Sequence, residues 1–204
     1  MAEGEAGGSR SLRVALLSTC AVSTPPRAYG GTELVVAELA RELVKLGHRP
    51  TVYATGDSTC AGDRGRAIFD RPVWPPDALA ELRHASAAWQ EIAARRHELD
   101  IVHANDARSL SFSQFVSLPT IATVHHHRED SLTKHYVDHP NVSFVGISKR
   151  QTDLVWEVPF RAVVHHGLNA DLYPFGEGGE ACAFLGRFAP EKGPHTAIDA
   201  ASDA

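Results

Sequence analysis

The feature that most constrains the fold is a strand–loop–helix–strand unit near the start of the chain. An apolar run at 13–18 predicts a buried strand, and a loop rich in proline and glycine follows it. From Thr32 to Leu46, apolar residues recur every three or four positions, which is typical of a helix packed on a sheet, and Gly47 is placed to end that helix. The run at 50–55 predicts the next strand. Such a unit implies parallel strands joined by a right-handed crossover.

The same alternation continues through most of the chain. Helices are predicted at 77–98, 109–116 and 148–155, and strands at 100–103, 119–124, 142–145 and 161–164. Strands that alternate with helices in this way predict an α/β fold, a Rossmann-like doubly wound parallel sheet.

The composition changes after Leu172. Residues 1–10 are polar and glycine-rich and are expected to form a disordered tail, so the first domain is predicted at 11–172. A linker rich in glycine and charge is predicted at 173–180. A strand at 181–185 and a helix beginning at Pro194 would then start a second domain, truncated at 204.

Bulk composition narrows the class of function. The formal net charge of −5 gives no electrostatic reason to expect nucleic acid as a partner. The three cysteines form no CxxC pair, which argues against a zinc site or a disulfide framework and favours the cytoplasm. The chain has neither an apolar signal segment nor the roughly 20 apolar residues that a transmembrane helix requires.

The first candidate site is the glycine loop between the first predicted strand and helix. Gly30 and Gly31 permit close backbone approach, and the helix start that follows offers free N–H groups to an anion. The alternative is a plain glycine turn capped by Thr32. Because the loop does not read G-x-G-x-x-G, a dinucleotide-dependent dehydrogenase or epimerase is disfavoured.

Histidines lie at or just after the ends of three predicted strands. His125 stands directly after the strand at 119–124, His166 follows the last strand, and His103, with Asp106 nearby, ends another. Imidazole at the carboxyl edge of a sheet can bond a hydroxyl or a phosphate. A purely structural histidine is equally open at each position. Three consecutive histidines at 125–127 make a poor metal site, because adjacent strand side chains point to opposite faces.

A pair of cations lies in the predicted second domain. Arg187 and Lys192 flank a proline-containing turn between a predicted strand and a helix. Converging there, they would suit a diphosphate, since arginine offers forked donors and lysine a point charge. The alternative is two solvated surface cations. A serine hydrolase is not supported, because no G-x-S-x-G motif is present.

An ordered set of motifs resembles glycosyltransferase family 4. The motifs are PPRAYGGTEL from Pro25, LGHRPTVYATGDS from Leu46, FVGIS from Phe144, VHHGL from Val164 and FLGRFAPEKG from Phe184. Each motif is weak alone, but their order and spacing together are specific. The resemblance covers nearly everything from Arg13 onward.

The resemblance implies a GT-B fold, in which two Rossmann-like domains flank the active site. It implies retaining transfer of a sugar, of hexosyltransferase type, from a UDP- or GDP-type nucleotide diphosphate sugar to a small-molecule or glycan acceptor, with no metal or other cofactor. His125 would sit beside the transferred sugar as the catalytic residue. The residues expected on the donor phosphates are Gly30, Gly31, Arg187 and Lys192. Those expected on other parts of the substrates are Glu33, His103, Asp106, Ser148 and His166.

Two departures from the family's pattern bear on activity. His126 stands where relatives carry a small residue, and the later E-x7-E glutamate pair is not found in these 204 residues. We therefore expect a glycosyltransferase that is weak or inactive as this chain alone. The other hypothesis is a non-catalytic module that binds an acceptor or pairs with a second copy or a separate donor-domain protein.

Overall fold

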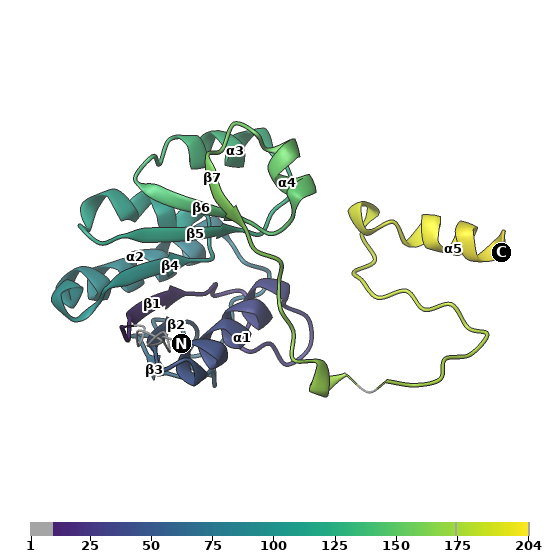
Figure 1. Cartoon of the computed structure of the whole chain (residues 1–204), viewed down its shortest axis with the longest axis horizontal. Coiled ribbons are helices and arrows are strands. Elements are labelled where there is room, and N and C mark those ends of the chain that lie inside the picture. Colours follow the sequence, from purple (N-terminus) through teal and green to yellow (C-terminus); the bar gives the residue numbers. More distant parts are fainter. Residues whose placement is uncertain (1–9, 174, 204) are drawn as a thin grey trace, which may run out of the picture. The chain divides into compact units, whose positions relative to one another are not determined.

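A computed structural model of the chain describes residues 10–173 and 175–203 (Figure 1). Residues 1–9 of the predicted disordered tail lie outside this description, as do Pro174 in the predicted linker and Ala204. Arg10, which ends the predicted tail, forms an ion pair with Asp100 at 2.8 Å. The chain divides into two compact units, residues 1–168 and 169–204.

The first unit is built on one sheet of seven strands, all paired in parallel. The strands are β1 (Arg13–Leu17), β2 (Arg49–Tyr53), β3 (Asp63–Arg64), β4 (Ile101–Ala104), β5 (Thr120–Val124), β6 (Val142–Gly146) and β7 (Phe160–Val163). Their spatial order is β3-β2-β1-β4-β5-β6-β7, and Figure 1 shows them fanned in that order.

Helices cover both faces of this sheet. They are α1 (Gly31–Lys45), α2 (Ala78–Ala94), α3 (Asp130–Val137) and α4 (Lys149–Leu154). Val36 and Ala40 of α1 pack with Leu16 on one face, whereas Trp89 and Ile92 of α2 pack on the opposite face. The predicted doubly wound α/β fold is confirmed.

The ends of these helices follow from local sequence. Asp77 caps α2, because its Oδ1 accepts a hydrogen bond from the backbone N–H of Ala80 at 2.9 Å. Gly47 takes a left-handed φ of 81° just after α1. Its N–H donates to Val44 and the N–H of His48 donates to Leu43, which satisfies carbonyls left over at the helix end. The predicted glycine end of the first helix is therefore confirmed.

Several predicted boundaries differ from the structure. The helix expected at 77–98 ends at Ala94 and continues as a 3-10 turn, η1 (Arg96–Glu98). The helix expected at 109–116 is a 3-10 segment, η2 (Arg108–Phe115). The sequence interpretation missed both β3 and α3. β3 has only two residues. α3 has only eight, so no apolar period stands out from the charged loop before it.

The second unit departs most from expectation. It contains η3 (Ala170–Leu172), η4 (Pro190–Lys192) and α5 (Pro194–Ser202). The strand expected at 181–185 is wrong, because that stretch is exposed and adopts no regular structure. A strand needs a neighbour to satisfy its backbone groups, and none pairs with this stretch in the part of the chain that the structure describes. The helix predicted from Pro194 is confirmed as α5.

The connection order defines one switch point in the sheet. From β1 the chain proceeds to β2 and β3 on one side, and it then returns to place β4 on the other side of β1. Ligands of such sheets bind beyond the carboxyl ends of the strands where the order reverses. A ligand site is therefore expected among the residues that follow β1 and β4.

Replacing Phe144 should test the core under β6. Its side chain is fully buried and meets Tyr136 edge to face, with the ring centroids 5.5 Å apart. Phe144→Ala should lower the free energy of unfolding by about 3–5 kcal/mol in urea denaturation, since it leaves a cavity. Phe115→Ala is the matched control, because 77% of that side chain is exposed and the expected change is within about 0.5 kcal/mol. Equal effects of the two changes would contradict this account of the core.

Candidate functional site at the carboxyl edge of the sheet

Asn105 joins the two strands at the switch point. It lies directly after β4 and is buried. Its backbone N–H and its side-chain Nδ2 both donate to the carbonyl of Leu17, the last residue of β1, at 3.1 and 3.2 Å. The side chain of Asn105 is thereby fixed at the reversal of the strand order.

His125 extends from β5 to this asparagine. Its Nε2 lies 3.0 Å from Oδ1 of Asn105. On its other side the ring stacks on His166, with centroids 5.2 Å apart and an interplanar angle of 20°. The structure therefore brings together two of the histidines that the sequence singled out, from the ends of β5 and β7.

The histidine ring is held in its neutral form. Burial, helped by the nearby His166, His126 and His103, lowers the pKa of His125 to about 3. A ring with so low a pKa carries no charge at neutral pH. His125 is therefore suited to hydrogen bonding and poorly suited to ion pairing with a phosphate.

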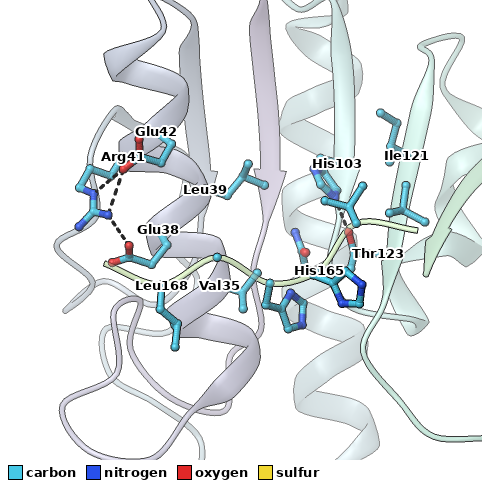
Figure 2. A pocket seen from close by; sticks show the side chains of 15 residues that line it. Val35, Glu38, Leu39, Arg41, Glu42, His103, Ile121, Thr123, His165 and Leu168 are labelled. Atoms are coloured by element: carbon cyan, nitrogen blue, oxygen red, sulfur yellow. Dashed lines mark hydrogen bonds and ion pairs between the residues drawn. The ribbon is translucent and has the colours of Figure 1, made fainter. Parts of the chain in front are cut away.

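His103 lies on the α1 face of the sheet, on β4. Its Nε2 is 2.8 Å from Oγ1 of Thr123, and burial lowers its pKa to about 4. Figure 2 shows this pair facing a cavity of about 390 Å³. The cavity lies between α1 and the side chains of His103, Ile121 and Thr123, and the segment 164–168, which includes His165, crosses it (Figure 2).

The glycine loop leads from β1 to the start of α1. A Cβ on Gly30 would lie 2.7 Å from Val22 Cγ2 and 2.8 Å from Pro26 Cβ, so only glycine fits there. A Cβ on Gly31 would meet no atom within 4 Å. Glu33 is buried in the first turn of α1, where its Oε1 accepts a hydrogen bond from the hydroxyl of Thr19. Gly30 is thus required for packing, and Gly31 leaves room beside the helix start.

A second cavity, of about 560 Å³, adjoins Asn105 on the other side. Asp106 lines it, and burial raises the pKa of this carboxyl group. Arg108 forms an ion pair with Glu81 across the cavity wall at 2.5 Å, and His126 lines the cavity as well. This cavity is less apolar than the one on the α1 face, and carboxyl groups such as those of Asp106 and Glu81 line it.

Ser148 serves the helix that follows β6. Its Oγ accepts a hydrogen bond from the backbone N–H of Gln151 at 3.1 Å and so caps α4. The amide of Gln151 in turn donates to the carbonyls of Val124 and His126, at 2.8 and 2.9 Å. Ser148 therefore steadies the loop that carries His125, and its predicted contact with substrate stays a prediction.

The two predicted phosphate-binding cations belong to the second unit. Arg187 and Lys192 are exposed and lie on either side of the start of η4. Gly193 follows in the left-handed conformation, with φ of 63°, and leads into α5. Their contact with a donor phosphate stays a prediction.

No group of three or more histidine, cysteine, aspartate or glutamate side chains is arranged to hold a metal ion within residues 10–173 and 175–203. Among the helices described, none is long and apolar enough to cross a membrane.

Sequence reasoning missed Asn105, Thr123 and Gln151. Asn105 was detectable in principle, because it follows a predicted strand directly, between the two residues that were chosen, His103 and Asp106. The hydrogen bonds of Thr123 and Gln151 join elements distant in sequence, and no local pattern indicates them.

The neutral state of His125 makes a prediction about stability. Its folded pKa, about 3, lies below the ordinary value of 6.5, so an unfolded chain binds a proton that the folded site rejects. Stability should be unaffected by this group above about pH 6.5 and should fall as the pH drops towards the folded pKa. Between pH 7 and pH 5, the wild type should lose about 1–2 kcal/mol more than His125→Asn in urea denaturation.

His97→Asn serves as the control for that measurement, since His97 is exposed and distant from the site. It should follow the wild-type pH dependence. An identical loss in the wild type and in His125→Asn would contradict the burial of a neutral ring.

Comparison with known proteins identifies the family of this domain. The model of Glycosyltransferase Family 4 matches residues 29–155, which is more than half of the chain. The matched range begins at the glycine loop and includes Asn105 and His125. No curated protein matches the chain.

Solved structures show the fold independently. HepE from Anabaena, in complex with UDP and glucose, is 18% identical, with a TM-score of 0.60 over 95% of this chain and 58% of HepE. The complex of HepE with UDP-glucose is 17% identical, with a TM-score of 0.59 and the same coverage of both chains. The chain thus spans 58% of the length of HepE. From the family match and this fold, the chain belongs to glycosyltransferase family 4.

Proposed function

We propose that this chain takes part in retaining transfer of a hexose from a nucleotide diphosphate sugar to a hydroxyl group of an acceptor, in the cytoplasm. Residues 11–172 would form the acceptor side of the active site. The observation that carries the proposal is His125, held between Asn105 and His166 at the switch point of a family 4 domain. Ligands bind beside this edge in open parallel sheets.

The proposed donor is a UDP-sugar, with a GDP-sugar as the second choice. The structures of HepE with UDP and with UDP-glucose support the choice of a UDP-sugar before a GDP-sugar. Gly31, beside an open space at the start of α1, is proposed to approach the donor phosphates. Gly30 would shape the turn, and Arg187 and Lys192 would neutralise the charge of the departing diphosphate.

His125 is proposed to bond a hydroxyl of the transferred sugar. The bond from the sugar's anomeric carbon to the diphosphate breaks while the acceptor oxygen forms its bond on the same face. The acceptor's hydroxyl proton passes to an oxygen of the leaving phosphate, so the step needs no protein nucleophile, metal or cofactor. Glu33, His103, Asp106, Ser148 and His166 are proposed to support the substrates around this centre.

A non-catalytic binding module is the second candidate. It is supported by the α1 face of the sheet, where side chains of β5 and β6 are only half-buried beside the 390 Å³ cavity. Parallel sheets are normally covered on both faces. A second copy of the chain or a separate donor-side protein is a proposed partner. Weak or absent turnover by the 204-residue chain alone would fit this candidate.

Replacing His125 tests the proposed site directly. His125→Ala should lower kcat with UDP-glucose by about 100-fold, because a contact made at the transition state is lost. The affinity for UDP in calorimetric titration should stay within about twofold of wild type. His127→Ala is the control, because that side chain is exposed in the same loop. Full activity in His125→Ala would contradict the proposed role.

Replacing the two cations tests the phosphate assignment. Arg187→Ala and Lys192→Ala should each weaken binding of UDP or GDP by about tenfold, the effect of losing one charge-assisted hydrogen bond. Calorimetric titration of each variant measures this, with Arg96→Ala as an exposed arginine control in the first unit. Unchanged affinity in both variants would refute the diphosphate assignment.

A further inference from the structure

The amide of Asn105 has one permitted orientation. Its Nδ2 donates to the carbonyl oxygen of Leu17 at 3.2 Å, and a carbonyl oxygen can only accept. Rotating the amide by half a turn would set its own oxygen against that carbonyl and leave two buried acceptors facing each other. The oxygen of the amide must therefore face His125.

That orientation determines which nitrogen of His125 carries the proton. Nε2 lies 3.0 Å from the amide oxygen, so the hydrogen between them belongs to Nε2. A neutral imidazole has one N–H donor and one acceptor nitrogen. Nδ1 is consequently the acceptor, and no hydrogen-bond partner for it exists in the part of the chain that the structure describes.

We propose that Asn105 is a positioning residue, which holds His125 as the Nε2–H tautomer so that Nδ1 accepts a hydrogen bond from a hydroxyl of the transferred sugar. This inference rests on the proposed function for the sugar contact. The tautomer itself follows from hydrogen bonds within the protein. It assigns a role to a residue that adjoins both cavities and ties the ring to the first strand.

The arrangement decides what His125 can do chemically. An acceptor nitrogen can orient a sugar hydroxyl, whereas the N–H that is needed to protonate a leaving group is engaged by Asn105. The low pKa of the ring also makes it a weak general base near neutral pH. His166, stacked on the ring, limits the rotation about the Cβ–Cγ bond that would carry Nε2 away from Asn105.

Nitrogen NMR of the wild-type chain tests the tautomer without any substitution. In protein with ¹⁵N-labelled histidine at pH 8, long-range proton–nitrogen spectra should show Nε2 protonated and Nδ1 unprotonated for His125. Comparison with the spectrum of His125→Ala assigns the signals. A protonated Nδ1, or two rapidly exchanging tautomers, would overturn the proposal.

Two substitutions at position 105 separate the tautomer from general stability. Asn105→Ala removes the acceptor, so the two nitrogen signals of His125 should move towards each other. Asn105→Asp keeps an acceptor opposite Nε2 and should retain the Nε2–H form at pH 8, although its second oxygen replaces the donor to Leu17 and lowers stability. Ser109→Ala is the matched control, because it also removes a buried hydrogen bond, from its hydroxyl to the carbonyl of Asp106, in the same segment. Wild-type signals in Asn105→Ala would contradict the inference.

Kinetics test the link to the sugar. Asn105→Ala should lower kcat with UDP-glucose by about tenfold and leave the affinity for UDP within about twofold. When added to His125→Ala, it should cause no further loss, because both changes remove the same interaction. Additive losses would show that Asn105 acts apart from His125. The correct tautomer without any sugar transfer would favour the non-catalytic binding module over the proposed transfer, and it would leave the tautomer assignment intact.

Discussion

The pairing of β1 with β4 is the constraint on which the first unit depends. It joins segments far apart in the chain, and Asn105 secures it by two hydrogen bonds to Leu17, a residue 88 positions away along the sequence. Since all strands are parallel, this pairing also aligns their carboxyl ends along one edge. Asn105 and His125 become neighbours for that reason, and a change that weakened the pairing would disperse the site along with the sheet.

Much of this arrangement could be predicted from the sequence. Short apolar runs indicate the strands, and apolar residues spaced three or four positions apart indicate the helices. Gly47 marks the end of α1, because a left-handed residue is needed there. Parallel strands share a carboxyl edge, so the sequence alone predicts His125 and His103 at that edge. The same reasoning predicts the fold class, because α1 and α2, with 15 and 17 residues, are long enough to show which face is apolar.

What could not be predicted depends on contacts between distant segments. The stretch 181–185 has the composition of a strand, but a strand also needs a paired neighbour, and composition does not supply one. The role of Ser148 as a helix cap depends on the backbone at Gln151, and the role of Asn105 depends on Leu17. Polar side chains of this kind follow no periodic pattern in the sequence. A histidine after a strand is therefore easier to identify as a candidate site residue than the asparagine that orients it.

The charge distribution links these findings to chemistry. The histidines at the edge have lowered pKa values because burial penalises their charged form, so they bring hydrogen bonds without positive charge. The second cavity adds the carboxylates of Asp106 and Glu81, with the single guanidinium of Arg108 beside them. An edge of this kind suits the hydroxyl groups of a sugar better than a diphosphate. The positive charge that a diphosphate requires must then come from other groups, and Arg187 and Lys192 are the proposed source. In this proposal His125 acts by hydrogen bonding alone, so the tautomer that Asn105 fixes decides which atom can contact the sugar.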